Sequence, residues 1–169
     1  KCNLKLVPIF AQFKLVLNDT FPEYYVGADE DYPVIENEHI DIQKKNYNQV
    51  SEEVNLILAD TYPIDIRQQI PINKRRLSMI IIERDRTDVS RYYSPQFVAK
   101  IVDEVRRLPS NVKDINVYAT TNPKHTLKIV RDAFKLAERG NIEKLVVFQQ
   151  EKNGNRKFGR KGKVIYNNR

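Results

Sequence analysis

The residues best suited to bind an anion lie in one short segment near the end of the chain. Residues 151–163 (EKNGNRKFGRKGK) contain six Lys and Arg against one acid, and three glycines make the segment pliable. A basic hairpin arm with an exposed aromatic ring can neutralise phosphates and stack on a base. The predicted nucleic-acid contacts in this arm are Lys152, Arg156, Lys157, Phe158, Arg160, Lys161 and Lys163. The alternative is a solvated loop whose aromatic ring folds back on the domain.

Two further groups of residues extend this hypothesis. Lys74, Arg75 and Arg76 are consecutive and could enlarge the basic patch, or simply mark a charged entry to a strand. The segment Asn122-Pro123-Lys124-His125 begins a predicted helix with cations where acids are usual. Backbone N–H groups at such a turn can bind an external anion. The predicted anion-binding residues there are Thr120, Thr121, Lys124 and His125.

The loop 83–93 offers the only candidate for metal chemistry. Glu83, Asp85 and Asp88 could hold a divalent metal, with Lys124 or His125 acting on a phosphate. The alternating acids and arginines of this loop are more typical of a self-paired, solvated segment. We therefore predict no metal and no cofactor, and keep a metal-dependent nuclease or phosphotransferase as an alternative to a non-enzymatic protein.

The charge of the chain differs sharply between its two parts. Residues 1–72 carry six Lys and Arg against twelve Asp and Glu, whereas residues 73–169 carry 23 against ten. We therefore predict an acidic N-terminal region, 1–72, and a basic domain, 73–169. A basic surface of this strength indicates an anionic partner, either nucleic acid or another acidic surface.

The remaining composition excludes several classes of protein. Cys2 is the only cysteine, so no internal disulfide is possible, which is typical of an intracellular, reducing compartment. One cysteine and two histidines are too few for a structural zinc site. No apolar run approaches the roughly 20 residues of a membrane span, so we predict no membrane partner.

The second part of the sequence has a regular pattern of elements. Apolar runs predict strands at Leu77–Ile82, Ile115–Ala119, Leu145–Phe148 and Val164–Tyr166. Helices are predicted after Ser94-Pro95 and Asn122-Pro123, which are N-cap and first-turn signals. Residues 77–167 therefore read β-α-β-α-β-β, an α/β (or α+β) fold. In element order this unit is similar to Alba-type chromatin and RNA-binding proteins and to the C-terminal domain of bacterial translation initiation factor 3. That resemblance implies nucleic-acid binding.

The first part predicts a smaller mixed α/β region. Leu4–Val7 and Phe13–Leu17 are expected to be short strands, residues 19–33 an acidic loop, and Val34–Ile42 a weak strand. Gln49–Asp60 is expected to be a helix because Val54, Ile57 and Leu58 share one helical face. Ile64–Asn73, which contains Pro71, is expected to be extended.

The function predicted from these patterns is a non-enzymatic nucleic-acid-binding module, either an RNA-binding protein or a ribonucleoprotein component. A viral or phage assembly protein is the second hypothesis, because complementary acidic and basic halves favour self-association. The metal-dependent enzyme is the third.

Overall fold

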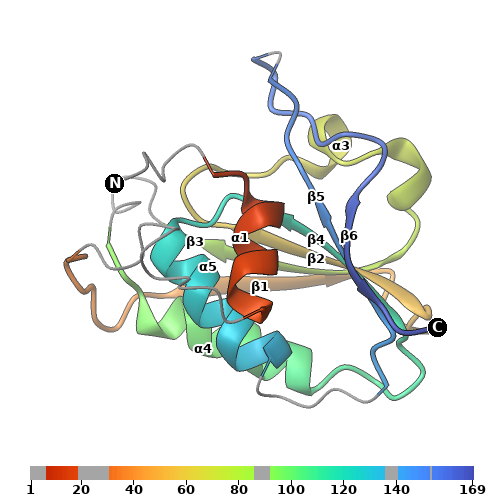
Figure 1. Cartoon of the computed structure of the whole chain (residues 1–169), viewed down its shortest axis with the longest axis horizontal. Helices are drawn as coiled ribbons and strands as arrows, with labels where there is room; N and C mark the ends of the chain where they lie inside the picture. The colour runs from red at the N-terminus through yellow and green to blue at the C-terminus, as the bar shows by residue number, and fades with distance from the viewer. Residues whose placement is uncertain (1–6, 19–30, 86–91, 136–140, 153) are drawn as a thin grey trace.

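The computed structural model describes residues 7–18, 31–85, 92–135, 141–152 and 154–169. Its centre is one six-stranded sheet in the order β1-β3-β2-β4-β5-β6 (Figure 1). The strands are β1 (Ile40–Lys45), β2 (Glu53–Ala59), β3 (Ser78–Arg84), β4 (Asp114–Ala119), β5 (Lys144–Phe148) and β6 (Lys163–Asn167). The four inner strands are parallel, and each edge strand is antiparallel to its neighbour.

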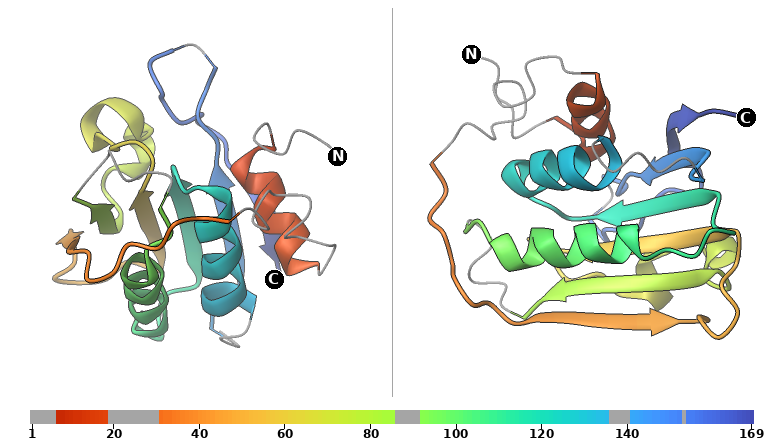
Figure 2. Two further views of the ribbon diagram at one scale, coloured as in Figure 1. Left: turned by 90° about the vertical axis from the view of Figure 1, so that its left-hand side faces the viewer. Right: turned by 90° about the horizontal axis from the view of Figure 1, so that it is seen from below.

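Helices cover the two faces of this sheet unequally. One face carries α1 (Ile9–Leu17), α4 (Pro95–Arg106) and α5 (Pro123–Ile129), and α5 continues as the π-helical turn η4 (Val130–Lys135). These helices lie side by side, with α5 between α1 and α4 (Figure 2). The other face carries none of these three longer helices, so we call it the helix-free face; among the described residues, the short α3 (Ile66–Gln69) and the 3₁₀ turn η2 (Ile72–Lys74) lie near it.

The predicted β-α-β-α-β-β order of residues 77–167 is confirmed by β3, α4, β4, α5, β5 and β6. Both predicted caps form: Ser94 Oγ accepts from the N–H of Phe97, and Asn122 Oδ1 accepts from the N–H of His125. The end of the second predicted helix, with Ala137 and Gly140, lies outside the described residues. The acidic region 1–72 and the basic domain 73–169 share this sheet, because β2 of the first lies between β3 and β4 of the second.

Most predictions for residues 1–72 were wrong. Glu53–Ala59 is a strand, not a helix, because β2 is buried on both faces and needs apolar residues at nearly every position. Phe13–Leu17 belongs to helix α1, and of Leu4–Val7 only Val7 is described, in a bend. Ile64–Asn73 contains α3 and η2 rather than an extended chain. The weak strand at Val34–Ile42 overlaps β1 only at its end.

Two apolar clusters hold these layers together. The larger one fills the space between the sheet and the three long helices and includes Leu56, Val117 and Ile101. The smaller one lies on the helix-free face beneath α3 and includes Ile57 and Tyr118. A sheet with parallel inner strands is expected to be covered on both faces, and here the second cover is only partial.

Candidate anion-binding cleft

Three parallel strands begin with polar side chains on the helix-free face. Because successive side chains of a strand point to opposite faces, Glu53 and Asn55 of β2 lie on that face together with Asp114 and Asn116 of β4. The strand register places Glu53 opposite Asp114 and Asn55 opposite Asn116. The helix-free face is therefore polar near the amino ends of the strands, whereas its carboxyl half is apolar.

The connection between β5 and β6, residues 149–162, folds against this apolar half; we call it the arm. Phe158 is 4% exposed and meets Tyr118 edge-on, with ring centroids 5.2 Å apart. Its N–H donates to the carbonyl of Gln69 of α3 at 2.9 Å, and Gln69 Nε2 donates to the carbonyl of Arg156 at 2.9 Å. The expectation that Phe158 is exposed is therefore wrong: its ring completes the second apolar cluster.

Gly162 brings the returning arm close to β5. A Cβ at this position would overlap Cγ1 of Val146 and lie 2.9 Å from Cε1 of Phe148. Glycine allows the backbone to approach these side chains directly. As a result Arg160 and Lys161, which precede Gly162, lie beside the amino half of the sheet.

A polar cleft of about 370 Å³ lies between the arm, η2 and the amino ends of β2, β4 and β5. We call it the basic cleft. Its lining residues are Glu53, Asn73, Lys74, Asp114, Asn116, Lys144, Val146, Phe148, Arg160, Lys161, Gly162 and Val164.

The charges that line the basic cleft do not cancel. Lys74 Nζ lies 2.6 Å from Glu53 Oε2, and Arg169 forms an ion pair with Asp114, so each acid has a cationic partner. Within the described ranges, the other three cations of the lining, Lys144, Arg160 and Lys161, form no salt bridge. The cleft lining therefore holds more cations than acids, and three of its cations are outside any salt bridge between described residues, an arrangement that favours an anionic ligand.

Glu53 is held firmly in the floor of the basic cleft. Its Oε2 accepts from Lys74 Nζ and from Asn116 Nδ2, both at 2.6 Å. Asn116 Nδ2 also donates to Asn55 Oδ1, and Asn55 Nδ2 donates to the carbonyl of Lys74. Burial alone would raise the pKa of Glu53, but the hydrogen bonds from Lys74 and Asn116, together with the positive charges of Lys74 and Lys144, outweigh it and hold the pKa below its ordinary value. Glu53 is therefore ionised at neutral pH.

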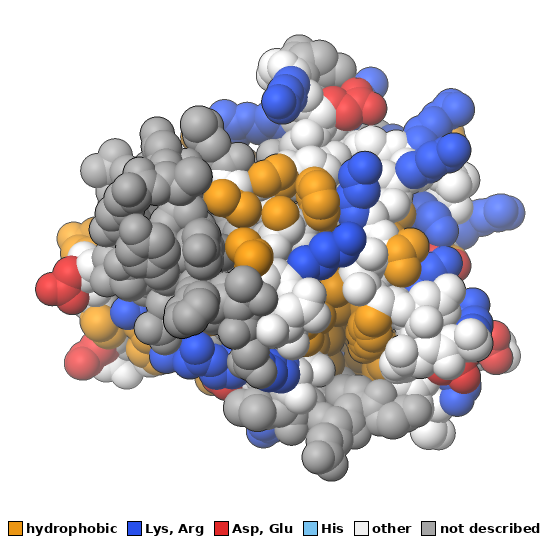
Figure 3. Space-filling model, viewed as in Figure 1, with side chains coloured by type: hydrophobic (Ala, Val, Ile, Leu, Met, Phe, Trp, Pro, Cys, Tyr) orange, Lys and Arg blue, Asp and Glu red, His pale blue; other side chains and the backbone are white. Residues whose placement is uncertain are grey.

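Three of the predicted contact residues line this cleft, namely Lys74, Arg160 and Lys161. The others lie elsewhere. The Arg156 guanidinium stacks 3.5 Å above the centre of the Tyr62 ring, Lys163 Nζ lies 5.6 Å from the centre of the Phe10 ring, and Arg75 Nε donates to the carbonyl of Ile70. Arg76, Lys152 and Lys157 are exposed outside the cleft. Seen from the helix-covered side, Lys and Arg side chains gather over the arm and the α3–η2 region (Figure 3).

Sequence reasoning missed the contributions of the sheet itself to the cleft. Lys144, Glu53 and Asn116 each come from the first three residues of a strand. One signal was available, because Glu53-Val54-Asn55 and Asp114-Ile115-Asn116 repeat an acid–apolar–Asn pattern. Read as strand alternation, that pattern places four polar side chains on one face. It was obscured because residues 49–60 were read as a helix.

The opposite, carboxyl edge of the sheet holds a buried network of charged groups. Arg84 donates to both carboxylate oxygens of Glu38, at 2.8 and 3.0 Å, and to Asp60 Oδ1 at 2.7 Å. Asp60 Oδ2 lies 2.7 Å from His125 Nδ1. His125 Nε2 accepts the N–H of Ser94 at 2.8 Å, so the ring is neutral and its proton is on Nδ1. Asp60 is therefore the central partner in this network, since it contacts both Arg84 and His125.

Of the four residues of the predicted anion site, His125 belongs to this network and the other three lie near it in the sequence or in contact with it. Thr120 Oγ1 accepts the N–H of Asp60 and donates to the carbonyl of Tyr62, while Thr121 Oγ1 is hydrogen bonded to Thr126 Oγ1. Thr120, Thr121 and His125 are buried and their polar atoms are used internally. Lys124 differs, with its Nζ 5.6 Å from the centre of the Tyr93 ring.

The acidic loop proposed for a metal is only partly described. Glu83 and Asp85 are placed, whereas Asp88 lies outside the described residues. In the part of the chain that the structure describes, no group of three or more His, Cys, Asp or Glu side chains could hold a metal ion. Burial, with the nearby Asp41 and Asp85 charges, raises the pKa of Glu83.

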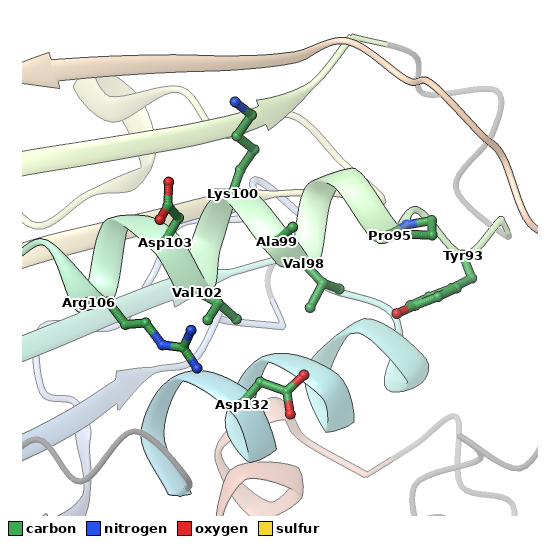
Figure 4. Close-up of a pocket in the computed structure, with 9 residues that line it drawn as sticks. All are labelled: Tyr93, Pro95, Val98, Ala99, Lys100, Val102, Asp103, Arg106 and Asp132. Atoms are coloured by element: carbon green, nitrogen blue, oxygen red, sulfur yellow. The ribbon is translucent and has the colours of Figure 1, made fainter.

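A larger hollow of about 590 Å³ lies between α4 and η4. Arg106 of α4 and Asp132 of η4 extend toward the space between them, and Val98 and Val102 line it (Figure 4). Its charged lining residues are two cations and two acids: Lys100, Arg106, Asp103 and Asp132. This balance gives the hollow no preference for an anion, so the smaller basic cleft is the better candidate.

Comparison with known proteins places this geometry in context. A family model, SUa-2TM, described as the SMODS- and Ubiquitin system-associated 2TM effector domain, matches residues 1–165. A search of curated protein sequences gives no significant match. Among the described residues, no helix combines the length and the apolar character needed to cross a membrane.

The structural neighbours include a receptor from Acinetobacter baumannii. This receptor is the Cap4 SAVED/CARF-domain containing receptor, in a structure with the cyclic trinucleotide 2′3′3′-cAAA. The alignment has a TM-score of 0.53 and 9% sequence identity, and it covers 80% of this chain and 29% of the receptor chain. The structure of the same receptor with 3′3′3′-cAAA aligns with a TM-score of 0.51 and 10% sequence identity, and the alignment covers 81% of this chain and 30% of the receptor chain. At this identity the similarity is one of fold, an α/β domain. The chain spans less than a third of the receptor's length.

These findings overturn the function predicted from the sequence. The matching family is one of effector domains, which are neither ribonucleoprotein components nor virion assembly proteins, and the structural neighbours are described as a receptor with cyclic trinucleotides rather than as RNA-binding proteins. The prediction failed because a basic surface indicates the sign of its partner but not its class. Polymeric RNA and small nucleotides carry the same phosphate groups.

Proposed function

Because the chain belongs to the SUa-2TM effector-domain family, we propose that it is the ligand-sensing part of an effector and binds an anionic nucleotide of the cyclic oligonucleotide class. The basic cleft is the proposed site. The observation that carries the proposal is the group of three cations that line the cleft and form no salt bridge among the described residues, namely Lys144, Arg160 and Lys161.

Two other observations support this assignment. The cleft volume of about 370 Å³ falls within the range of about 300–1,000 Å³ typical of small-molecule sites. The fold is shared with receptors whose structures contain cyclic trinucleotides. Phosphates of the ligand would lie against the three cations, where charge-assisted hydrogen bonds are short and strong.

The walls of the cleft suggest how binding could be signalled. Lys74 lies on η2, Lys144 on the sheet, and Arg160 and Lys161 on the arm. A ligand that contacts all three elements would favour conformations in which the arm and η2 are drawn together over the sheet. A ligand shifts such an equilibrium only by its difference in affinity for the two conformations.

The test is calorimetric titration of the protein with 3′3′3′-cAAA at low and at physiological ionic strength. The variant Arg160→Ala/Lys161→Ala should bind at least about tenfold more weakly, since hydrogen bonds between charged groups contribute about 1.5–3 kcal/mol each. Binding of the parent protein should weaken as salt rises, because these side chains are exposed and therefore screened.

The matched control is Lys45→Ala/Lys100→Ala, which removes two exposed cations from β1 and α4, outside the cleft. This variant should bind as the parent does. Equal losses in the two double variants would mean that binding depends on net charge and not on the cleft. Absence of binding by the parent at low salt would exclude this ligand from the proposed site.

A further inference from the structure

We propose that Glu53 determines the specificity of the basic cleft by accepting a hydrogen bond from a donor group on the base or sugar of a bound nucleotide. This inference rests on the proposed function of the cleft. It adds that the cleft selects nucleotides over inorganic polyphosphates of similar charge.

The first reason is the position of an acid in a cationic cleft. Glu53 is the first residue of β2 and lines the cleft floor between Lys74 and Asn116, with its side chain 30% exposed. An ionised carboxylate repels a phosphate, so a cleft that bound only phosphate groups would be weakened by it. A ligand with both phosphates and neutral hydrogen-bond donors gains from the cations and from the acid.

The second reason is the unused hydrogen-bonding capacity of the carboxylate. Both hydrogen bonds to Glu53, from Lys74 and Asn116, go to Oε2. Among the described residues no donor is bonded to Oε1. An ionised carboxylate has about four acceptor positions on its two oxygens. Glu53 can therefore accept a hydrogen bond from a ligand without losing either internal partner.

The third reason is that Glu53 is already oriented before a ligand arrives. Asn116 is 3% exposed and is itself fixed by Asn55 across the β2–β4 register. Asn55 in turn holds the backbone of Lys74. A group fixed in this way loses little conformational entropy on binding, which is what favours selective recognition.

The simpler explanation is that Glu53 only neutralises Lys74. The two explanations predict opposite changes in nucleotide affinity when Glu53 is replaced. If Glu53 only balances charge, replacing it with an uncharged residue should strengthen the binding of every anion. If it accepts a ligand donor, the replacement should weaken nucleotide binding and strengthen polyphosphate binding.

The experiment titrates the full chain and Glu53→Gln with 3′3′3′-cAAA and, separately, with inorganic tripolyphosphate. We expect Glu53→Gln to bind 3′3′3′-cAAA about tenfold more weakly, as for the loss of a hydrogen bond to a charged group. Tripolyphosphate should bind the same variant several-fold more tightly. Glu52→Gln removes an equal charge from the exposed neighbouring residue and should leave the ratio of the two affinities unchanged.

A second variant separates the loss of a ligand hydrogen bond from a general change in folding. Glu53→Asp keeps the charge and shortens the side chain, so it should weaken 3′3′3′-cAAA binding while tripolyphosphate binding stays near that of the parent. The purine-riboside trimer, which lacks the exocyclic amine, and the 2′-deoxy trimer then identify the donor. Whichever analogue binds the parent and Glu53→Gln equally lacks the group that Glu53 recognises.

The outcomes separate this inference from the proposed function. If Arg160→Ala/Lys161→Ala reduces 3′3′3′-cAAA binding but Glu53→Gln shifts both ligands in the same direction, the cleft is confirmed and the role of Glu53 is refuted. The same conclusion follows if neither analogue removes the dependence on Glu53. If the parent binds neither ligand, both proposals fail.

Discussion

Replacement of Phe158 by alanine tests the structure at the point where it departs most from the sequence. An exposed aromatic on a basic arm would be neutral for stability, because surface substitutions usually stay within about 0.5 kcal/mol. In the structure Phe158 is buried against Tyr118 and Phe148 beneath α3. Truncation of a buried phenylalanine typically costs about 3–5 kcal/mol. For a protein of this size the loss corresponds to a fall in melting temperature of about 6–20 °C.

The assay is urea unfolding followed by circular dichroism, with Lys157→Ala as the control. Lys157 is the exposed neighbour of Phe158, so its replacement should leave the free energy of unfolding almost unchanged. Because Phe158 anchors the arm that carries Arg160 and Lys161, Phe158→Ala should also weaken binding of 3′3′3′-cAAA in conditions where the variant is folded. A destabilisation below about 1 kcal/mol would refute the claim that this ring is part of the core.

Three more outcomes follow from the described contacts. Asp60→Asn should destabilise the protein by about 3–5 kcal/mol in urea unfolding, because it leaves Arg84 buried with half of its carboxylate partners; a change below about 1 kcal/mol would count against that network. Burial and the charge of Glu53 raise the pKa of Tyr118 above its ordinary value of 10. Above about pH 10 the hydroxyl of Tyr118 therefore stays protonated in the folded protein, whereas it ionises in the unfolded chain. Stability should therefore be unaffected by this group below about pH 10 and fall as the pH rises further, and ultraviolet titration should show Tyr118 ionising only with unfolding. Deletion of residues 1–72 removes β1 and β2 and should leave a chain without a cooperative unfolding transition by calorimetry; a folded fragment would refute the importance of β2.

The second half of the chain was predictable because several local signals agree there. Ser94-Pro95 and Asn122-Pro123 combine a capping side chain with a proline that fits the first helical turn, and both caps form in the structure. The apolar runs that alternate with these helices are too short for helices of their own and are bounded by turn residues, which favours buried strands. Local preference and tertiary environment favour the same structure, so the sequence alone was sufficient.

The first half was mispredicted because apolar spacing is ambiguous in a continuous run. Val54, Ile57 and Leu58 match a helical face, but Leu56 and Ala59 are also buried, so beyond Asn55 the run is apolar on both faces of the strand. A short apolar run of this kind is typical of an inner parallel strand. Conversely, Phe13 and Val16 of α1 were read as a strand, although both face the core with a spacing of three residues.

The basic cleft was only half visible in the sequence for a different reason. Consecutive cations such as Arg160 and Lys161 are conspicuous, whereas Lys144 and Glu53 lie at the starts of strands and outside any cluster of cations. What joins them is the sheet register and the fold of the arm over Gly162. Both arise from pairings between residues far apart along the chain, which local patterns do not encode.

The position of β2 between β3 and β4 also has a consequence for biosynthesis. About 60 residues separate β2 from its partner β4 along the chain, so this central pairing has high contact order and is expected to form slowly. At about 5–20 residues per second, β4 leaves the ribosome several seconds after β2. During that interval one edge of a mostly apolar inner strand has no partner, and unpaired apolar edges are sites of aggregation. The nascent chain is therefore most in need of a chaperone between the synthesis of residue 59 and that of residue 119.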